Sequence, residues 1–496
     1  MNQVLEIVTS KKLTYEQKLN ALAHAAEDTL NVIDIPDKTK YYFEKESICD
    51  MFEGNAPYRP RYVMPDYVRY IENGSAFLKV EPPTDLDELL NALMIIYNHV
   101  PSITSFPVYL GNLDKMIEPF LGDLSDADIK KKLRLFLNFL DRTITDSFCH
   151  ANIGPEYTRA GRLILEVEKE LNNAVPNFTI KYDPDITPDE FGELAVYTSL
   201  YCANPAFCND KLNKEVYSSD YGISSCYNIL PVGGGAYTLS RITLTNLAKL
   251  AESPEQFLEE LLPEVLELLA DYMNERIRFL VEESGFFESS FLVKEGLIDS
   301  DKFVGMFGIT GLAECANTLI GDSHKKYGNN VEVDALADKI MHKIASFLEN
   351  APAKYSKIVG GRFMLHAQVG LDSDHGITSG VRIPVGDEPE NMFKHLRHSA
   401  RFHHLITSGC GDIFPIETTA RDNPAAVLDI VKGAFKEGVK YMSFYEENSD
   451  LVRITGYLVK RSEMEKFNND EVVLQNTTHL GAPNYEENRL ADRKVR

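Results

Sequence analysis

The chain has 496 residues, of which 44% are hydrophobic and 25% charged, and its formal net charge is −24. These proportions are typical of a soluble globular protein with a large buried core, and they exclude long disordered regions. The acidic balance argues against non-specific binding to nucleic acid or to an anionic membrane, because both need an excess of lysine and arginine.

The cysteines are seven in number, widely scattered, and form no CxxC pair. An odd, scattered set indicates reduced thiols rather than a disulfide framework or a zinc ribbon. The first residues show no apolar segment after a basic start, and the chain has no apolar run of about 18 residues. We therefore predict a cytoplasmic protein without a signal peptide or a membrane-spanning segment.

Helical periodicity dominates the first part of the chain. Thr14 and Gln17 have the spacing of a capping box at the start of an amphipathic segment. Residues 41–80 are rich in Tyr, Pro and Gly and are predicted as loops with short extended pieces. The predicted helices cover 14–30, 84–97, 125–141, a segment that ends near 171 and a segment that begins at 187.

Residues 200–235 show no helical period. They contain Cys202, Cys208 and Cys226 and end in the run Gly233-Gly-Gly. A long irregular stretch inside a compact domain is more often functional than idle. This stretch is therefore a candidate for part of the active site.

The remaining chain alternates strands and helices. Pro263 is expected to bend the long helix in which it lies. No internal repeat or low-complexity linker is visible, which favours one catalytic unit with a helical N-terminal layer. The predicted elements are strands at 237–244, 362–370, 381–386 and 441–445, helices at 253–282, 331–348, 390–406 and 423–436, a strand that runs into a helix at 306–315, and a loop at 407–417.

The segment from Arg453 to Leu458, Arg-Ile-Thr-Gly-Tyr-Leu, contains a glycine that is itself a candidate reactive group. Glycine has no Cβ, so the Cα–H bond of Gly456 is open to attack, and a radical left on Cα can delocalise over the flanking amides. The alternative is a turn glycine at the end of a strand. A strand-like segment leads into the motif, and a cysteine in a Gly-rich loop is available as its partner.

These features resemble the glycyl radical enzymes, whose C-terminal loop carries Arg-Val-x-Gly-Tyr and close variants. Leu458 makes the motif more similar to the anaerobic ribonucleotide reductase branch than to the pyruvate formate-lyase branch. Two further segments resemble the superfamily: Gly234 to Leu244, downstream of Cys226, and Phe307 to Glu314, with its Gly-x-x-Gly-Leu-x-Glu pattern. Each motif is short, so the resemblance depends on their occurring together.

The resemblance implies an α/β fold, a barrel of two antiparallel-packed parallel half-sheets surrounded by helices, with the Cys and Gly loops meeting inside. It divides the chain into residues 1–435, which form the barrel with the cysteine loop, and residues 436–496, which form the C-terminal glycyl radical segment. It also implies that Gly456 stores the radical and that Cys226 becomes the thiyl.

Cys410, in Ser-Gly-Cys-Gly-Asp, is the alternative thiyl residue or a second active-site thiol. Asp412 and Glu417, on the loop after it, are candidate acids or bases, as are His366, Asp374 and His375, although each could equally be an ordinary loop or strand residue. Cys149, Cys202 and Cys208 could line the cavity, whereas Cys49 and Cys315 are expected to be buried small hydrophobic residues. The histidines at 395, 398, 403 and 404 match no zinc spacing, so we interpret them as part of a charged helix rather than as a metal site.

The chain departs from both well-known branches. It lacks the two CxxC pairs that precede the glycine motif in the reductases, and it lacks the adjacent Cys-Cys pair of pyruvate formate-lyase. It is most similar to the YjjI family of glycyl radical enzymes. The expected activity is oxygen-sensitive radical chemistry of the lyase or elimination type on a small organic substrate. The alternatives are a ribonucleotide reductase-like enzyme, a formate acetyltransferase-like acyl lyase, and an inactive or radical-domain repair protein.

The resemblance also implies the partners. A separate radical-SAM activase, which uses S-adenosylmethionine and an iron–sulfur cluster, installs the radical, and no cofactor needs to stay bound to the chain. The activase must reach the Gly456 loop, so that segment is expected to swing outward. A homodimer is also expected from the resemblance.

Overall fold

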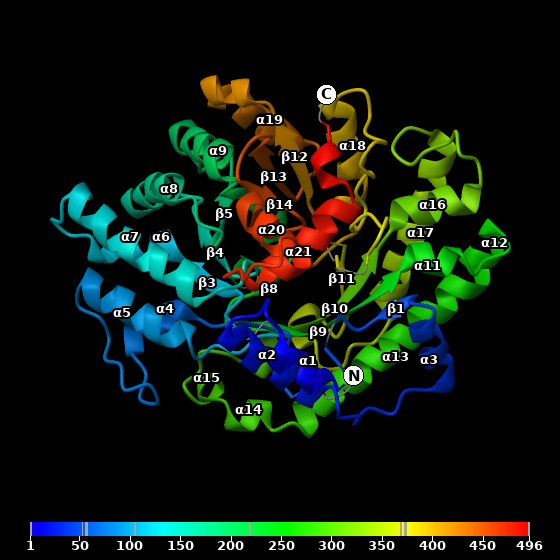
Figure 1. Ribbon diagram of the computed structural model, residues 1–496, viewed down its shortest axis with the longest axis horizontal. Coiled ribbons are helices and arrows are strands. Elements are labelled where there is room, and N and C mark those ends of the chain that lie inside the picture. The colour runs from blue at the N-terminus through cyan, green and yellow to red at the C-terminus, as the bar shows by residue number, and fades with distance from the viewer. Residues whose placement is uncertain are drawn as a thin grey trace.

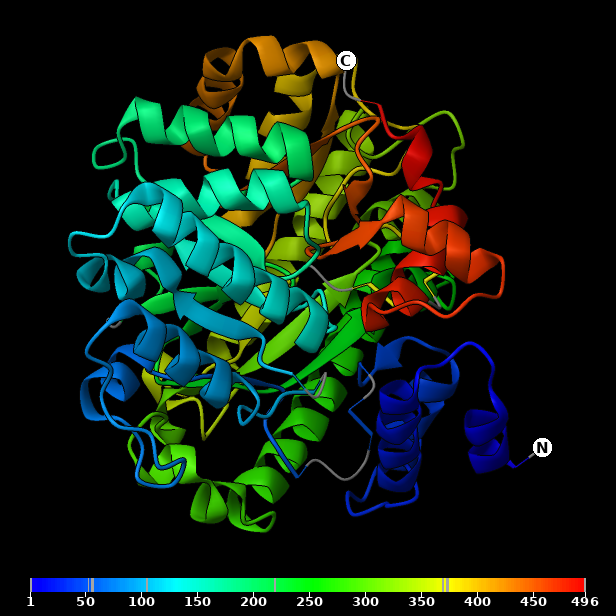
Figure 2. The ribbon, with the colours of Figure 1, turned by 60° about the vertical axis from the view of Figure 1, so that its left-hand side comes forward.

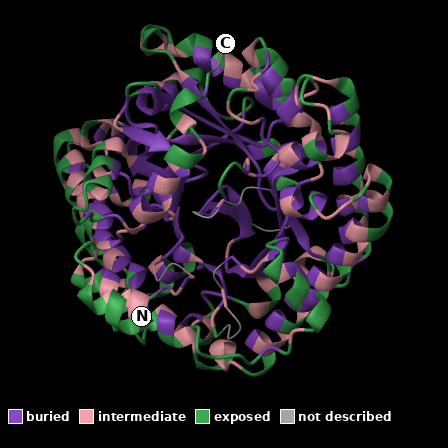
Figure 3. Cartoon of the chain, turned by 45° about the vertical axis from the view of Figure 1, so that its right-hand side comes forward, coloured by how far each residue is buried: buried purple, intermediate pink, exposed green. Residues whose placement is uncertain are grey.

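Parallel strands, buried along their length, form the centre of the molecule (Figure 3). The computed structural model describes residues 2–51, 53–54, 58–103, 106–217, 220–367, 370–371 and 374–494. The first half-sheet consists of the parallel strands β3 (Tyr109–Asn112), β4 (His150–Ile153), β5 (Asn177–Tyr182) and β6 (Ala206–Asn209), and the short strand β2 (Tyr62–Met64) lies beside β3. The second half-sheet consists of β9 (Gly234–Thr243), β10 (Phe303–Thr310), β11 (Met364–His366), β12 (Asp412–Ile416) and β13 (Tyr441–Glu446).

The two half-sheets join at both edges in antiparallel fashion. On one side β13 pairs with β6, where Tyr441 lies opposite Cys208. On the other side β2 pairs with β9, where Tyr62 lies opposite Ala236, and β2 packs beside β3. Within the second half-sheet, a parallel bridge between His366 and Gly409 connects β11 to the chain that enters β12. The result is the barrel of two antiparallel half-sheets that the sequence predicts.

A layer of helices covers the outside of the barrel (Figure 1). The first half-sheet is flanked by α5 (Leu86–Tyr97), α7 (Asp126–Thr143), α8 (Arg159–Leu171) and α9 (Asp189–Cys202). The second half-sheet is flanked by α11 (Leu244–Ala248), α13 (Leu262–Glu282), α16 (Leu312–Ile320), α17 (Val331–Asn350), α18 (Met392–His403) and α19 (Pro424–Lys436). These helices are amphipathic, and their apolar faces supply the interior while their polar faces meet solvent.

Local signals account for the long helices. The Ser125 side chain accepts a hydrogen bond from the Asp128 N–H and so caps α7. Thr14 and Gln17 form the predicted capping box of α2 (Tyr15–Glu27). Pro263 lies in the first turn of α13, directly after a turn of π-helix at Phe257–Leu261. Proline cannot supply the hydrogen bond of a regular α-helical turn, and the bend expected there stays a prediction.

Short elements differ from the sequence-based predictions. Residues 41–80 contain α4 (Tyr67–Asn73) and the last part of α3 (Asp37–Glu44) as well as two short strands, β1 (Ile48–Cys49) and β2. Residues 381–386 form no strand, and the predicted loop at 407–417 contains β12. The predicted strand at 362–370 is confirmed only for β11, and residues 368–369 lie outside the described residues. These segments are too short for periodicity to identify, and pairing within the barrel decides their conformation.

The N-terminal and C-terminal segments lie next to each other on one side of the barrel (Figure 2). The Gln17 amide on α2 donates a hydrogen bond to the carbonyl of Val473, at 3.1 Å. Two C-terminal helices, α20 (Arg461–Asn468) and α21 (Asn476–Glu487), follow the last hairpin. Because β13 is a strand of the barrel, the chain leaves the sheet only after Glu446, and the predicted division at residue 435 stays a prediction. Among the described residues, no helix is long and apolar enough to cross a membrane.

Candidate active site

A hairpin that runs through the barrel carries Cys226 at its tip. It is formed by β7 (Tyr221–Ser224) and β8 (Asn228–Pro231), and we call residues 221–231 the Cys226 hairpin. The turn residues Ser225 and Tyr227 have φ values of 49° and 63°, in the left-handed region. The Asn152 amide on β4 fixes the hairpin, since its Nδ2 donates to the carbonyl of Ile223 at 3.0 Å and its Oδ1 accepts from the same residue's N–H at 2.8 Å.

A second hairpin carries Gly456 at its tip. It is formed by β14 (Leu451–Arg453) and β15 (Leu458–Lys460), and we call residues 451–460 the Gly456 hairpin. All residues from 451 to 459 are buried. The Arg453 guanidinium lies behind the tip, where it donates to the carbonyl of Ala203 at 2.9 Å and to that of Gly456 at 3.4 Å. The arginine of the sequence motif therefore fixes the position of the glycine.

The tips of the two hairpins are in direct contact. A Cβ atom built on Gly456 would lie 2.5 Å from Cα of Cys226 and 3.0 Å from its carbonyl carbon, so only glycine fits. Gly456 is not among the residues with positive φ, hence its backbone conformation does not require glycine. The glycine is therefore needed for its close approach to Cys226 and not for a left-handed turn conformation.

The environment of Cys226 keeps its sulfur protonated. Burial raises the pKa of the thiol, and hydrogen bonds from the Thr455 hydroxyl and the Gly456 N–H oppose this rise only in part. The Cys226 Sγ lies 3.5 Å from Oγ1 of Thr455. A protonated thiol carries the hydrogen atom that a carbon radical can take, whereas a thiolate does not.

A cavity of about 640 Å³ lies against Cys226. Its polar wall includes Arg61, Tyr62 and His366, and helix α2 forms part of its cover. A larger cavity, of about 1010 Å³, surrounds Tyr221 at the base of the Cys226 hairpin and does not include Cys226 among its lining residues. We therefore assign the cavity of 640 Å³ to the candidate active site, because it is the one that a substrate could share with the thiol.

His366, which the sequence offers as a candidate acid or base, lines the cavity, whereas most of the other lining residues were not predicted. Arg61 and Phe148 come from irregular segments, and Tyr62 begins the short strand β2. Asn476 and His479 come from α21, so no spacing in the sequence connects these residues. Only the Arg-rich and Tyr-rich segment around residues 58–62 offered a local signal.

Cys410 lies behind the Cys226 hairpin rather than in the cavity. It is buried, and burial raises the pKa of its thiol to about 12. Its neighbours Gly409 and Gly411 pack closely against Tyr227, the residue after Cys226. The structure therefore brings the Cys410 loop to the Cys226 hairpin, but it is Cys226 that faces Gly456. Cys149, Cys202 and Cys208 are buried and do not line the cavity, contrary to expectation.

Asp412 and Glu417 lie at opposite ends of β12 and do not line the cavity. Asp412 is buried and accepts hydrogen bonds of 2.9 Å from His395, Ser399 and Arg493. Burial would raise the pKa of this carboxyl, but the charges of Arg493 and His395 outweigh it and hold the pKa far below its usual range. Glu417, in contrast, is exposed to solvent.

The other candidate polar residues have structural surroundings. Asp374 forms a buried ion pair with Arg241, and His375 is exposed. The predicted charged helix at residues 390–406 is α18, and three of its histidines, His395, His398 and His403, are buried against the barrel. Among the described residues, no group of three or more His, Cys, Asp and Glu side chains could hold a metal ion.

Solved structures share this fold at low sequence identity. An anaerobic ribonucleotide reductase superimposes with a TM-score of 0.70 at 14% identity, covering 89% of this chain and 82% of that chain. Hydroxyproline dehydratase from Clostridioides difficile, solved with trans-4-hydroxy-L-proline, gives a TM-score of 0.72 at 11% identity, covering 100% and 88%. A structure concerned with 1,2-propanediol dehydration in Roseburia inulinivorans gives a TM-score of 0.70 at 12% identity, covering 99% of this chain and 88% of that chain.

Sequence relatives extend over the whole chain. A protein of Haemophilus influenzae is 44% identical over 100% of this chain and 98% of its own length. The protein YjjI of Escherichia coli is 41% identical over 99% of this chain and 95% of its own length. The family model described as glycyl radical enzyme YjjI-like matches residues 13–496. The chain therefore belongs to the YjjI-like family of glycyl radical enzymes.

Proposed function

We propose that this protein is an oxygen-sensitive radical enzyme in which Gly456 stores the radical and Cys226 transfers it to a small organic substrate. The single observation that carries this proposal is the contact between the two hairpin tips, where a Cβ on residue 456 would lie 2.5 Å from Cα of Cys226. Close approach of this kind is what hydrogen-atom transfer between two fixed groups requires.

The proposed cycle moves one hydrogen atom at a time. The Gly456 Cα radical takes the hydrogen atom of the Cys226 thiol, which restores the glycine Cα–H bond and leaves a thiyl radical on sulfur. The thiyl then takes a hydrogen atom from a substrate C–H bond, which restores the thiol and leaves a substrate radical. After the substrate radical has reacted, the product radical recovers the hydrogen atom from Cys226, and the thiyl recovers one from Gly456.

The surroundings suit both steps. Burial raises the pKa of the Cys226 thiol, so the sulfur keeps its hydrogen atom at neutral pH. The Gly456 hairpin is buried from residue 451 to residue 459, which limits the access of oxygen and water to a stored radical. The cavity of about 640 Å³ beside Cys226 has the size of a small-molecule site.

For the substrate radical we propose an elimination or lyase reaction. Two of the structures that share the fold are concerned with dehydration, of hydroxyproline and of 1,2-propanediol. The second candidate is ribonucleotide reduction, which the fold of the anaerobic reductase favours. Nucleotide binding distinguishes the two, since only a reductase needs a nucleotide in the cavity. An acyl lyase is disfavoured because the chain has no adjacent cysteine pair.

The remaining proposals start from the family to which the chain belongs. We propose that a radical-SAM activase installs the radical, using S-adenosylmethionine and its own iron–sulfur cluster, and that the Gly456 hairpin moves outward to meet it. We also propose that the protein acts in the cytoplasm and forms a homodimer. A radical-domain repair protein is disfavoured, because this chain contains a complete barrel with its own Cys226 hairpin.

Anaerobic electron paramagnetic resonance tests the proposal. The protein is coexpressed with a radical-SAM activase, its spectrum is recorded, and the chain is then exposed to air and analysed by mass spectrometry. A doublet signal and backbone cleavage at Gly456 are the expected results. If activases that demonstrably cleave S-adenosylmethionine and bind the protein produce neither, the proposed radical store is wrong.

A further inference from the structure

The cavity beside Cys226 contains one buried cation with an unused hydrogen-bond donor. Arg61 is 8% exposed and lines the cavity. Its Nη1 donates to the carbonyl of Met51 at 3.0 Å and to Oε1 of Glu53 at 2.9 Å. Its Nε has no hydrogen-bond partner among the described residues. A buried N–H of a guanidinium without a partner is costly, unless a ligand supplies the acceptor.

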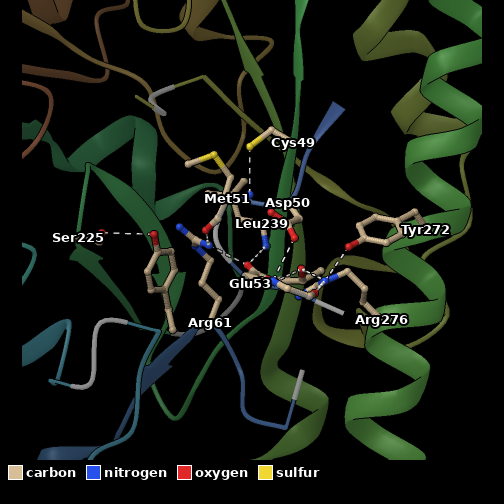
Figure 4. Close-up of polar contacts among 12 residues, drawn as sticks. Cys49, Asp50, Met51, Glu53, Arg61, Ser225, Leu239, Tyr272 and Arg276 are labelled. Carbon is tan, nitrogen blue, oxygen red and sulfur yellow. Dashed lines mark hydrogen bonds and ion pairs between the residues drawn. The ribbon is translucent and has the colours of Figure 1, made fainter. Parts of the chain in front are cut away.

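The ion pair with Glu53 does not fully compensate this charge. Glu53 is shared, because its Oε2 also accepts a hydrogen bond of 2.9 Å from the buried guanidinium of Arg276 (Figure 4). Its two oxygens accept further bonds from the Leu239 N–H and the Thr238 hydroxyl. One carboxylate thus serves two arginines and two neutral donors, and Arg61 keeps part of its positive charge for the cavity.

Three acidic residues line the cavity. Asp28 is exposed to solvent at the end of α2, and the other two are engaged elsewhere. The Asp50 carboxylate accepts the Gly54 N–H at 3.0 Å, and its charge acts on Arg276. The Asp146 carboxylate accepts the Phe148 N–H at 3.0 Å. None of the three forms an ion pair with Arg61, whose carboxylate partner among the described residues is Glu53. An anion in the cavity would therefore meet Arg61 as its nearest strong donor.

Arg61 also lies close to the reactive thiol. Its positive charge lowers the pKa of Cys226, although burial raises that pKa more strongly. The Arg61 guanidinium carbon lies 5.2 Å from the ring centre of Tyr62, and the Tyr62 hydroxyl accepts a hydrogen bond from Ser225, the residue before Cys226. A group held by Arg61 would therefore place its adjacent carbon atoms beside Cys226.

We propose that Arg61 binds the anionic group of the substrate and that the substrate is a small organic carboxylate. The planar guanidinium matches the geometry of a carboxylate, and a charge-assisted hydrogen bond in a site shielded from water both binds and orients. The rest of the cavity suits an organic body, since Met51, Ile103, Phe148, Leu371 and Leu480 contribute apolar surface. This inference rests on the proposed function for its use of Cys226 as the reacting group.

Alkylation of Cys226 by two matched reagents tests the inference without any radical. Iodoacetate and iodoacetamide differ in charge but hardly in size, and each is applied to the unactivated protein while the labelling of the Cys226 peptide is followed by mass spectrometry. The measured quantity is the ratio of the iodoacetate rate to the iodoacetamide rate. Changes in thiol pKa and in access cancel in this ratio, because they affect both reagents alike. The same ratio on N-acetylcysteinamide, a neutral free thiol, provides the reference.

We expect the ratio at Cys226 to exceed the reference by about tenfold or more, the effect of one charge-assisted hydrogen bond. R61Q should lower the ratio to near the reference, and E53Q should raise it, because that variant frees the charge of Arg61. R59Q is the matched control: Arg59 lies on the same segment, pairs with Glu27 and does not line this cavity. It should leave the ratio unchanged.

Several results would overturn the inference: a ratio at the reference value in the unmodified protein, a ratio that R61Q leaves high, or no labelling of Cys226 by either reagent. The opposite effects of R61Q and E53Q separate loss of the site from general misfolding. The test is also independent of the radical. A high ratio in a protein that never shows a radical signal would contradict the proposed function but support the anion site. A radical signal in a protein whose ratio equals the reference would support the proposed function but contradict the anion site.

Discussion

Gly456 and Cys226 face each other so closely that a Cβ on residue 456 would lie 2.5 Å from Cα of Cys226. They are separated by more than two hundred residues of sequence, and each stands at the tip of its own buried hairpin. The barrel thus brings one glycine and one thiol together in its buried interior.

The first prediction concerns the space at Gly456. G456A should abolish the radical signal and also lower the free energy of unfolding by about 1–3 kcal/mol, because the added methyl group would overlap the backbone of Cys226. Urea denaturation measures the second effect. G433A is the matched control, since Gly433 lies inside α19 with nothing within 4 Å of an added Cβ, and it should stabilise the protein by about 0.5–1 kcal/mol. An unchanged stability of G456A would contradict the close contact.

The second prediction separates two carboxylates that the sequence placed together. D412N should lower the free energy of unfolding by about 3–5 kcal/mol, because it leaves the buried Arg493 without its counter-charge. E417Q should change it by less than about 0.5 kcal/mol, because Glu417 is exposed. Equal effects of the two variants in urea denaturation would show that Asp412 does not have the buried environment described here.

The third prediction concerns pH and His150, which lies on β4 near the Gly456 tip. Burial lowers the pKa of His150 to about 3, and the charge of Arg453 acts in the same direction, against hydrogen bonds to Phe148 and Gly456. Below about pH 6.5 the unfolded chain therefore takes up a proton at this histidine, whereas the folded protein does not. The free energy of unfolding consequently decreases as the pH is lowered. Between pH 7 and pH 5, His150 alone accounts for a decrease of about 2 kcal/mol in the free energy of unfolding.

H150Q removes this share. The difference in free energy of unfolding between the unmodified protein and H150Q should therefore shrink by about 2 kcal/mol from pH 7 to pH 5. It should stay constant between pH 7.5 and pH 8.5, where the imidazole is neutral in both states. His403 has its pKa lowered by burial to about 3 as well and contributes equally to both proteins. A difference that is constant over the whole range would mean that His150 titrates normally in the folded protein.

The barrel and the pair of Gly456 and Cys226 were accessible from the sequence, because a short motif with distinctive chemistry indicated the glycine and a Gly-rich neighbourhood indicated the cysteine. Arg61 was not, since it lies in an irregular segment far from both and reaches the cavity only through the folding of the barrel. β12 was mistaken for a loop because Gly409, Gly411 and Pro415 are typical of turns, yet the two glycines are needed for packing against Tyr227. Pairing across the barrel, which leaves no local pattern, decided these positions.

The most direct test of the account is the exchange of deuterium into the Gly456 radical. The hydrogen that remains on Cα of Gly456 splits the resonance signal into a doublet, and the hydrogen of the Cys226 thiol exchanges with solvent. If the two groups pass a hydrogen atom back and forth, the doublet of the activated protein should collapse in D₂O. C226S should keep the radical and the doublet, because serine has no thiol hydrogen to exchange. In C410S the doublet should collapse as it does in the unmodified protein. A doublet that persists in the unmodified protein, or one that collapses in C226S but persists in C410S, would contradict the assignment of Cys226 as the partner of Gly456.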